Sequence, residues 1–558
     1  MTDVLDQPWL KVHDELGMQV PDYEDRPLAD YLAEHASKRG DNVALRFHDR
    51  GITYAEFDRY ASQLANALKD LGVKKGDVVG IHMPNVPQYP IALAAISRLG
   101  AVGSGVSPLL TPPEMEYQIQ NASIRVMLSL DVLAPLYGAI ESAPNCLQAV
   151  IITGGADLLA PGEITLPEID GVKVLSWLDA VNGQSEQCEQ IPVHWNDPFM
   201  IQYTGGTTGL PKGAELSVRS IMHNPAQYLT ALEYVVGSEV TASAFPMFHI
   251  AGLTAAISGT IIAAEMILLP DPRNVEFFCR QMQKFRPTIL SAVPALYDML
   301  LGCPLFHEID FSRVKLANSG AAPLPRVTYE AVAGVLGEGK LTDIFGMTET
   351  GPCYTTHPPG RYKVGSVGFP VPGANVRIMD VETGTQQMPM GEAGEIICSG
   401  PQVMKGYLNL PDETANALRD IDGEPWMFGG DVGYMDEEGY LFLCDRAKDM
   451  LVVGGFKVFS VEVEDKLKSV PCIAASAVIG VPDEERRGND IVTLYVQLVP
   501  ESAGDEPDTL REQILEYCQE QLAPYKVPKQ IHFIEQIPLT AVGKIDKKQL
   551  REEAQSGA

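Results

Sequence analysis

Helical and extended hydrophobic patterns alternate through the first half of the chain. Thr53 and Glu56 have the spacing of a capping box, and apolar residues then recur at helical spacing until Gly72, a natural helix stop. The stretches that follow predict a strand over residues 78–83, a buried helix over 86–99 and a strand of small residues over 101–106. Alternation of this kind is typical of layered α/β folds.

The pattern changes in the second half. Residues 365–445 read as short β-rich pieces separated by Gly, Pro and Asp, which predicts a barrel or a small sheet. Beyond them, strands over 450–453 and 475–481, a helix over 509–521 and a basic tail over 526–551 predict a small α+β domain. We place the boundary close to Arg446, Ala447 and Lys448.

The predicted fold class is therefore α/β with two domains. A large N-terminal domain over residues 1–446 consists of layered α/β subdomains plus a β-barrel-like subdomain, and a small α+β domain covers 447–558. A chain of 558 residues exceeds what one hydrophobic core organises, which agrees with this division.

Composition excludes several classes of protein. No stretch approaches the ~20 consecutive apolar residues of a membrane helix, and the amino terminus lacks the basic and apolar regions of a secretory signal. We therefore expect a cytoplasmic protein without an integral membrane segment. The nine cysteines are scattered without a Cys-x-x-Cys pair, which disfavours disulfides and zinc. A formal charge of −31 repels nucleic acid, so no nucleic-acid partner is expected.

The candidate chemistry begins with a loop between two predicted strands, over residues 199–203 and 214–218. The loop carries Thr204, Gly205, Gly206, Thr207, Thr208 and Lys212. Glycines leave backbone N–H groups open to close approach, threonines add hydroxyl donors and the lysine adds a compact positive charge, so the loop suits a polyphosphate such as ATP. It is not the Walker pattern, because Lys212 is followed by glycine and alanine rather than by serine or threonine opening a helix.

Further polar clusters follow in a fixed order. They are Phe-Pro-Met-Phe-His at 245–249, Ser-Gly-Ala-Ala-Pro at 319–323, Phe-Gly-Met-Thr-Glu at 345–349, Gly430-Asp431 with Asp445-Arg446, and Gly-Lys-Ile at 543–545. At these residues the chain closely resembles the adenylate-forming superfamily of acyl- and aryl-CoA synthetases, nonribosomal-peptide adenylation domains and firefly-type luciferases. The resemblance spans nearly the whole chain.

The resemblance implies a two-step reaction with ATP, Mg²⁺ and coenzyme A. A carboxylate attacks the α-phosphate of ATP to give acyl-AMP and pyrophosphate, and a thiol then displaces AMP. Since one anion attacks another, the site must supply cations and preorganised donors. The resemblance also implies that the small domain is mobile.

The resemblance implies a set of nucleotide-binding residues. They are Thr204, Gly205, Gly206, Thr207, Thr208, Lys212, Gly320, Ala321, Ala322, Asp343, Phe345, Gly346, Thr348, Asp431, Arg446 and Lys544. Within this set the threonines of the loop and Lys212 cradle the triphosphate, and the Thr348 hydroxyl meets phosphate oxygen. Asp343 accepts a hydrogen bond from the adenine amino group, while Gly320 to Ala322 and the Phe345 ring sandwich the base. Asp431 accepts the ribose hydroxyls.

Position 345 departs from the family. Most members carry tyrosine there, so a role for a phenol hydroxyl is lost, whereas stacking is retained.

The resemblance also assigns catalysis, metal binding and domain movement. The catalytic residues are Lys544, Thr348, Glu349 and His249, with Lys544 bridging the carboxylate and the α-phosphate. Glu349 holds Mg²⁺, which prefers oxygen ligands. Lys448 occupies the hinge position, and Gly455 lets the pantetheine arm of coenzyme A pass.

The acid is expected to be apolar. Amino-acid-activating members place an aspartate near residues 247–249, where this chain has no partner for an ammonium group. The candidate acyl pocket is His249, Gly252, Leu253, Ala256, Gly320 and Met347. Because these residues are mostly small and apolar, they fit a hydrocarbon tunnel. His249 lies near the substrate carboxylate or gates the tunnel, or else is a satisfied core histidine.

The sequence thus predicts an AMP-forming acyl-CoA synthetase for medium- to long-chain or similarly apolar acids. Three alternatives stay open: loading of a carrier protein, activation of aryl or arylalkanoic acids, and a non-catalytic nucleotide- or acyl-binding module. Retention of Lys544, Glu349 and Asp431 together argues against the module. Members of the superfamily are often monomers or dimers, so the resemblance allows a homodimer.

Overall fold

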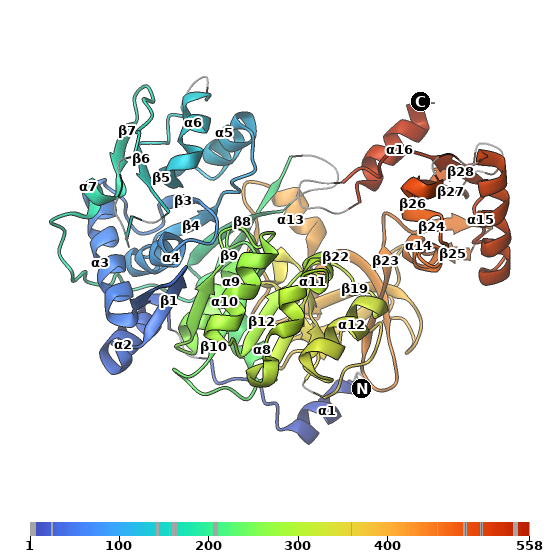
Figure 1. The fold of residues 1–558 in the computed structure, drawn as a ribbon, viewed down its shortest axis with the longest axis horizontal. Helices are drawn as coiled ribbons and strands as arrows, with labels where there is room; N and C mark the ends of the chain where they lie inside the picture. Colours follow the sequence, from blue (N-terminus) through green and yellow to red (C-terminus); the bar gives the residue numbers. More distant parts are fainter. Residues whose placement is uncertain are drawn as a thin grey trace.

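The computed structural model describes most of the chain. The residues it describes are 7–23, 26–140, 144–155, 157–158, 162, 164–204, 210–358, 360–454, 456–483, 486, 488–502, 504, 506–539 and 545–556, without the side chains of 555 and 556. Within these residues two large sheets with their covering helices form the body of the molecule, and a smaller α+β part stands beside it (Figure 1).

The first sheet contains the two strands, β8 and β9, that flank the threonine- and glycine-rich loop in the sequence. Its eight described strands run in the order β20-β9-β8-β4-β3-β5-β6-β7. Their bounds are β3 (Val78–His82), β4 (Val102–Gly105), β5 (Ile124–Leu130), β6 (Ala149–Thr153), β7 (Lys173–Ser176), β8 (Pro198–Thr204), β9 (Lys212–Ser217) and β20 (Gly406–Tyr407). Strands β8 to β7 are parallel, whereas β9 and β20 add antiparallel pairs at the edge.

Helices cover this sheet where the hydrophobic pattern predicts them. α3 (Tyr54–Asp70) begins at the predicted capping box, in which the Thr53 side chain accepts from the Glu56 N–H and the Glu56 side chain accepts from the Thr53 N–H. α4 (Gln88–Leu99) is buried along its whole length, as predicted. These local predictions are confirmed because each depends on residues close together in the chain.

The second sheet brings two further clusters to one edge. Its seven described strands run in the order β14-β13-β12-β10-β11-β1-β2, with bounds β1 (Val43–Phe47), β2 (Arg50–Thr53), β10 (Val240–Ser243), β11 (Glu265–Leu268), β12 (Ile289–Ala292), β13 (Leu316–Ser319) and β14 (Leu341–Asp343). β13 and β14 are parallel, so their carboxyl ends meet at the same edge.

Helices pack around this second sheet and between it and the first. They are α8 (Val218–Leu229), α9 (Ile250–Ile261), α10 (Val275–Phe285), α11 (Pro294–Leu301) and α12 (Arg326–Leu336). α9 packs against both α8 and α2 (Leu28–Arg39), which joins the two halves of the large part.

The β-rich segment forms a small antiparallel sheet. Its described strands are β18 (Asn375–Met379), β19 (Gly394–Ser399), β21 (Leu418–Ile421), β22 (Glu424–Met435) and β23 (Leu441–Arg446), and β23 branches from β22 outside the main order. α13 (Pro411–Ala417) interrupts the segment. A short sheet of β15 (Phe345–Gly346), β16 (Cys353–Thr356) and β17 (Phe369–Pro370) precedes it.

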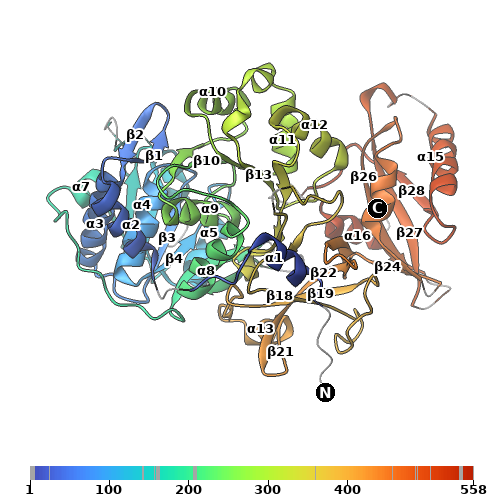
Figure 2. The ribbon, with the colours of Figure 1, turned by 90° about the horizontal axis from the view of Figure 1, so that it is seen from below.

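The C-terminal part has its own core and stands apart from the body in both views (Figures 1 and 2). It consists of β24 (Leu451–Val453), β25 (Phe456–Val458), α14 (Ser460–Leu467), β26 (Ile473–Pro482), β27 (Asp490–Leu498), α15 (Pro507–Gln521), β28 (Gln530–Phe533) and α16 (Lys547–Ser556). The predicted α+β class of this part is confirmed. None of the helices in the described residues is long and apolar enough to span a bilayer.

Candidate active site

The two ends of the threonine- and glycine-rich loop lie opposite one another. Thr204 ends β8 and Lys212 begins β9, and the two residues are directly paired in the antiparallel ladder. Gly205, Gly206, Thr207 and Thr208 lie outside the described residues. The ladder therefore holds the first hydroxyl and the lysine of the predicted phosphate cradle side by side.

Lys212 contacts two residues, Tyr407 and Glu413, from the segment that follows β19. Its Nζ forms an ion pair with Glu413 on α13, and it lies 5.1 Å from the centroid of the Tyr407 ring. Tyr407 reaches this place because β20 pairs with β9, opposite Ala214.

Thr348 and Glu349 form a buried turn, each with 9 % of its surface exposed. The Glu349 Oε1 accepts a hydrogen bond of 2.7 Å from the Tyr407 hydroxyl, and its carbonyl accepts from the Met404 N–H at 2.8 Å. Burial, followed by the charge of Glu349, raises the pKa of the Tyr407 phenol above its usual range. The phenol is therefore a donor at neutral pH, and it holds one oxygen of the carboxylate.

The preceding Gly346 belongs to the same turn for a steric reason. A Cβ at this position would lie 1.8 Å from the Pro352 carbonyl oxygen, so the backbone can pass only if residue 346 is glycine.

The candidate adenine site lies where β13 and β14 end. Gly320 follows β13, and a Cβ there would lie 2.9 Å from the Ile344 Cγ1. Ala321 adopts a left-handed conformation with φ of 66° and is exposed. Such strained backbone clusters at ligand sites. Phe345, next to the end of β14, packs edge-on against Tyr354 with ring centroids 5.1 Å apart.

Asp343 is buried at the end of β14. Burial raises the pKa of its carboxyl to about 8, although the backbone N–H groups of Leu324 and Ile344 act in the opposite direction. Its carboxyl is therefore largely protonated at neutral pH. Its carbonyl oxygen is 2.9 Å from the His357 Nδ1.

Asp431 and Arg446 form an ion pair between adjacent strands. They are opposite one another on β22 and β23, and the Arg446 Nε lies 2.7 Å from the Asp431 Oδ1. Arg446 also donates through Nη1 to the Gly429 carbonyl at 3.0 Å. Gly429 packs on the Met347 side chain, since a Cβ there would lie 2.2 Å from the Met347 Cε. The predicted ribose pair is thus adjacent to the Phe-Gly-Met-Thr-Glu segment.

The residues predicted for the acyl pocket have visible packing roles. His249 caps α9, with its Nδ1 accepting from the Ala251 N–H at 3.3 Å. Leu253 and Ala256 are buried in the main hydrophobic core, and a Cβ on Gly252 would lie 2.1 Å from the Pro246 carbonyl oxygen. Their role in acyl binding, like the catalytic role of His249, stays a prediction.

The structure describes the predicted hinge residue but not the two predicted residues of the small domain. Lys448 lies in the turn over 447–449 that links β23 to β24. Gly455 and Lys544 lie outside the described residues.

Sequence reasoning missed Tyr407 and Glu413. Tyr407 follows a glycine in a two-residue strand, and Glu413 sits in an acidic first turn of a short helix. Neither local pattern differs from ordinary surface sequence. Only the pairing of β20 with β9 brings them to Lys212.

Comparisons with known proteins match most of the chain to one family of enzymes. The family model described as AMP-binding enzyme matches residues 32–408, and that of the AMP-binding enzyme C-terminal domain matches residues 462–544. A long-chain-fatty-acid–CoA ligase of Bacillus subtilis is 35% identical over 570 aligned residues, covering 98% of each chain. One of Escherichia coli O6:H1 with the same name is 31% identical, covering 94% of each.

Among solved structures, the anthranilate CoA ligase AuaEII in complex with anthranoyl-AMP superposes with a TM-score of 0.84 at 28% identity. The match covers 97% of this chain and 99% of that one.

Proposed function

The chain belongs to the AMP-binding enzyme family, and from this premise we propose that it is an AMP-forming acid–thiol ligase. It activates an apolar carboxylic acid, a medium- to long-chain fatty acid or a similar acid, with ATP to give acyl-AMP and pyrophosphate. Coenzyme A then displaces AMP to give acyl-CoA.

The observation that carries this proposal is the linked set of charged groups across the site. Lys212 and Glu349 contact the same residue, Tyr407, and the Asp431–Arg446 pair joins the segment before Glu349 through Gly429. Two cations, a carboxylate for a metal ion and a carboxylate that can accept hydrogen bonds from a ribose thus come from four separate stretches of the chain. This is the set that adenylation of one anion by another requires.

The residues of the site divide the first step between them. Thr204 and Lys212, with Gly205, Gly206, Thr207 and Thr208, bind the triphosphate that leaves as pyrophosphate. Thr348 donates to phosphate, Arg446 reaches ribose and phosphate, and Asp431 accepts the ribose hydroxyls. The adenine site is lined by Gly320, Ala321, Ala322, Phe345 and Gly346. Asp343 accepts a hydrogen bond from the amino group of the adenine. Lys544 bridges the acid and the α-phosphate.

The oxygen donors of Thr348 and Glu349 fit Mg²⁺, a hard cation. In the part of the chain that the structure describes, no group of three or more His, Cys, Asp or Glu side chains is placed to hold a metal. Magnesium, when bound, neutralises charge on the phosphates. Glu349 would hold the ion, and this carboxylate accepts a hydrogen bond from the Tyr407 hydroxyl.

The second step is carried by the small domain over residues 447–558. Rotation at Lys448 removes Lys544 from the site and brings up Gly455, past which the pantetheine thiol enters. The acyl group occupies the pocket of His249, Gly252, Leu253, Ala256, Gly320 and Met347.

The choice of a fatty acid rests on the two relatives named long-chain-fatty-acid–CoA ligase. The structural likeness to an anthranilate CoA ligase keeps an aryl acid as the second candidate.

Pyrophosphate exchange tests the proposal. Purified protein with MgATP and labelled pyrophosphate is offered fatty acids of increasing length, aryl acids and amino acids, and exchange is expected with the apolar acids. Adding coenzyme A is expected to yield AMP and thioester in equal amounts. ATP binding without exchange for any acid would instead support a non-catalytic binding module, and exchange without thioester would point to a carrier protein.

A cytoplasmic location and a homodimer complete the proposal. Cell fractionation followed by immunodetection tests the first, and light scattering after size-exclusion chromatography tests the second. Membrane-bound protein or a pure monomer, respectively, would contradict them.

A further inference from the structure

We propose that Tyr407 is a positioning residue that fixes the Glu349 carboxylate and the Lys212 ammonium relative to one another. The proposal rests on the nucleotide site proposed above. Its subject is a half-buried tyrosine that neither the hydrophobic pattern nor the ordered polar clusters indicate.

One aromatic side chain contacts both charged groups, through different parts of itself. The hydroxyl donates to the Glu349 Oε1 at 2.7 Å, and the ring centroid lies 5.1 Å from the Lys212 Nζ. A phenol is rigid and has only two side-chain torsions, so the two contacts define one distance between carboxylate and ammonium. A hydrogen bond to a charged acceptor and a cation over an aromatic face both strengthen in a half-buried site.

The Tyr407 backbone is itself held from its own segment. Its N–H donates to the Thr414 Oγ1 at 2.8 Å, and the Thr414 hydroxyl donates to the Leu410 carbonyl at 2.8 Å. The neighbouring Gly406 has φ of 152°, and a Cβ there would lie 2.7 Å from the Thr414 Cγ2. The backbone from which the Tyr407 ring extends is therefore held in one position.

Backbone hydrogen bonds on either side of Tyr407 tie the same segment to the turn of Glu349 and to the strand of Lys212. The Met404 N–H donates to the Glu349 carbonyl and the Leu408 N–H donates to the Gly213 carbonyl, each at 2.8 Å. The backbone thus spans from the metal-site turn to the strand that begins at Lys212. Tyr407 lies in the middle of this span and adds the side-chain contacts.

Lys212 has a second partner that differs in kind. The Glu413 carboxylate that pairs with it is exposed to 46 % of its side-chain surface, so an incoming phosphate can replace it. The Tyr407 ring carries no charge to be repelled by phosphate and stays in contact. The ring therefore keeps the ammonium in place while its anionic partner is exchanged.

Two substitutions separate the two contacts. Tyr407→Phe removes the hydroxyl and keeps the ring, so the Mg²⁺ concentration for half-maximal pyrophosphate exchange is expected to rise about tenfold. ATP binding measured by calorimetry with EDTA is expected to be unchanged. Tyr407→Leu removes the ring as well, so metal-free ATP binding is expected to weaken about threefold to tenfold.

The chain provides a matched control in Tyr440. Its hydroxyl donates to the Arg361 carbonyl at 2.9 Å, and its ring lies 4.8 Å from the Lys363 Nζ, which also pairs with a carboxylate, that of Asp436, at 2.6 Å. Tyr440→Phe thus removes an equivalent hydroxyl at the far end of the β22–β23 hairpin. It is expected to leave the Mg²⁺ and ATP dependence at wild-type values.

Calorimetry of ATP binding with and without Mg²⁺, thermal unfolding and exchange kinetics are measured on the wild type and all three variants. A Mg²⁺ requirement raised in Tyr407→Phe but not in Tyr440→Phe, at similar melting temperatures, supports the proposal. Equal metal dependence and equal metal-free ATP affinity in the Tyr407 variants and the control would overturn it. If the wild type binds ATP but shows no pyrophosphate exchange, the proposed function is overturned. The calorimetric comparison of the variants would still decide the role of Tyr407.

Discussion

The nucleotide side of the site and the small C-terminal part are built in opposite ways. Glu349 on the nucleotide side is held by hydrogen bonds from the Tyr407 hydroxyl and the Met404 N–H of one neighbouring segment, and its turn is tied to the core. The C-terminal part follows a short turn and has a separate core. The comparison shows a carboxylate fixed by its neighbours beside a C-terminal part that packs on its own. Under the proposed function, Lys544 and Gly455 belong to this separately packed part, whose movement remains a proposal.

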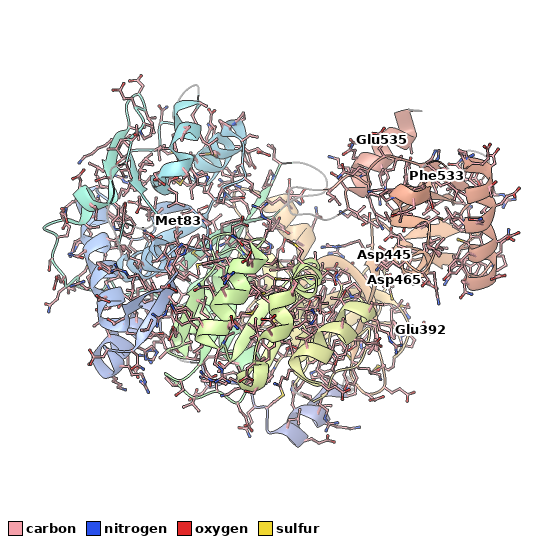
Figure 3. All side chains as sticks on the ribbon, viewed as in Figure 1. Met83, Glu392, Asp445, Asp465, Phe533 and Glu535 are labelled. Carbon is pink, nitrogen blue, oxygen red and sulfur yellow. The ribbon has the colours of Figure 1, made fainter. Side chains whose placement is uncertain are left out.

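Polar contacts lie at the junction between the two parts. Asp445, at the end of β23, accepts from the Ser460 hydroxyl at 2.7 Å, and Figure 3 labels it beside the ribbon that leads into the C-terminal part. Lys547 donates to the same hydroxyl at 2.6 Å and lies 2.8 Å from the Glu464 Oε1. Polar contacts can be exchanged for others when a domain rotates, and a large apolar interface cannot.

The largest effect is expected from Lys544→Ala. Because this substitution removes the cation proposed to follow the charge from acid to phosphate, adenylation is expected to fall by about a thousandfold or more, as for other charge-stabilising groups. Transfer of preformed acyl-AMP to coenzyme A is expected to persist. Pyrophosphate exchange and a thioester assay with synthetic acyl-AMP measure the two steps. Lys548→Ala, an exposed lysine nearby, is the control, and unchanged exchange in Lys544→Ala would remove the assignment.

Next in size is Lys448→Pro. Proline fixes φ near −65°, so a hinge at this position can no longer take up both of its backbone conformations. The thioester step is expected to fall by about tenfold to a hundredfold more than adenylation, with Lys448→Ala near wild type. Single-turnover measurement of each half-reaction tests this. An equal loss in both steps would argue against the hinge.

Lys547→Met probes the polar junction. It leaves the buried carboxylates of Asp445 and Glu464 without the cation that lies beside them, so a loss of about 3 kcal/mol in the free energy of unfolding of the C-terminal part is expected. Burial already raises the pKa of both carboxyls, and this cation opposes the shift. Hydrogen exchange over α14 and α16 measures the effect against Lys548→Met. Unchanged protection would mean that the cluster does not hold the junction.

The smallest effect, on the fixed side, concerns Asp343. Its pKa of about 8 in the folded chain means that it keeps its proton between pH 5.5 and 7, where the unfolded chain has lost it. Unfolding then releases a proton, so this group makes wild-type stability fall by about 2 kcal/mol over that interval. Asp343→Asn lacks this dependence and is expected to gain that amount relative to the wild type.

Urea unfolding of both proteins at pH 5.5 and pH 7 measures the difference. A wild type that instead gains stability over Asp343→Asn as the pH rises would contradict the raised pKa.

The sequence by itself determined the elements and the candidate chemistry. The capping box of α3, the buried α4 and the strand before the threonine- and glycine-rich loop follow from spacings of a few residues, because helix and strand periods are local. The ordered polar clusters indicated an ATP site in the same way. What only the tertiary structure decided is which distant groups meet: Glu413 reaches Lys212 across 201 positions, and Lys547 reaches Ser460 across 87. Strand pairing and domain docking set these contacts, and local spacing carries no record of either.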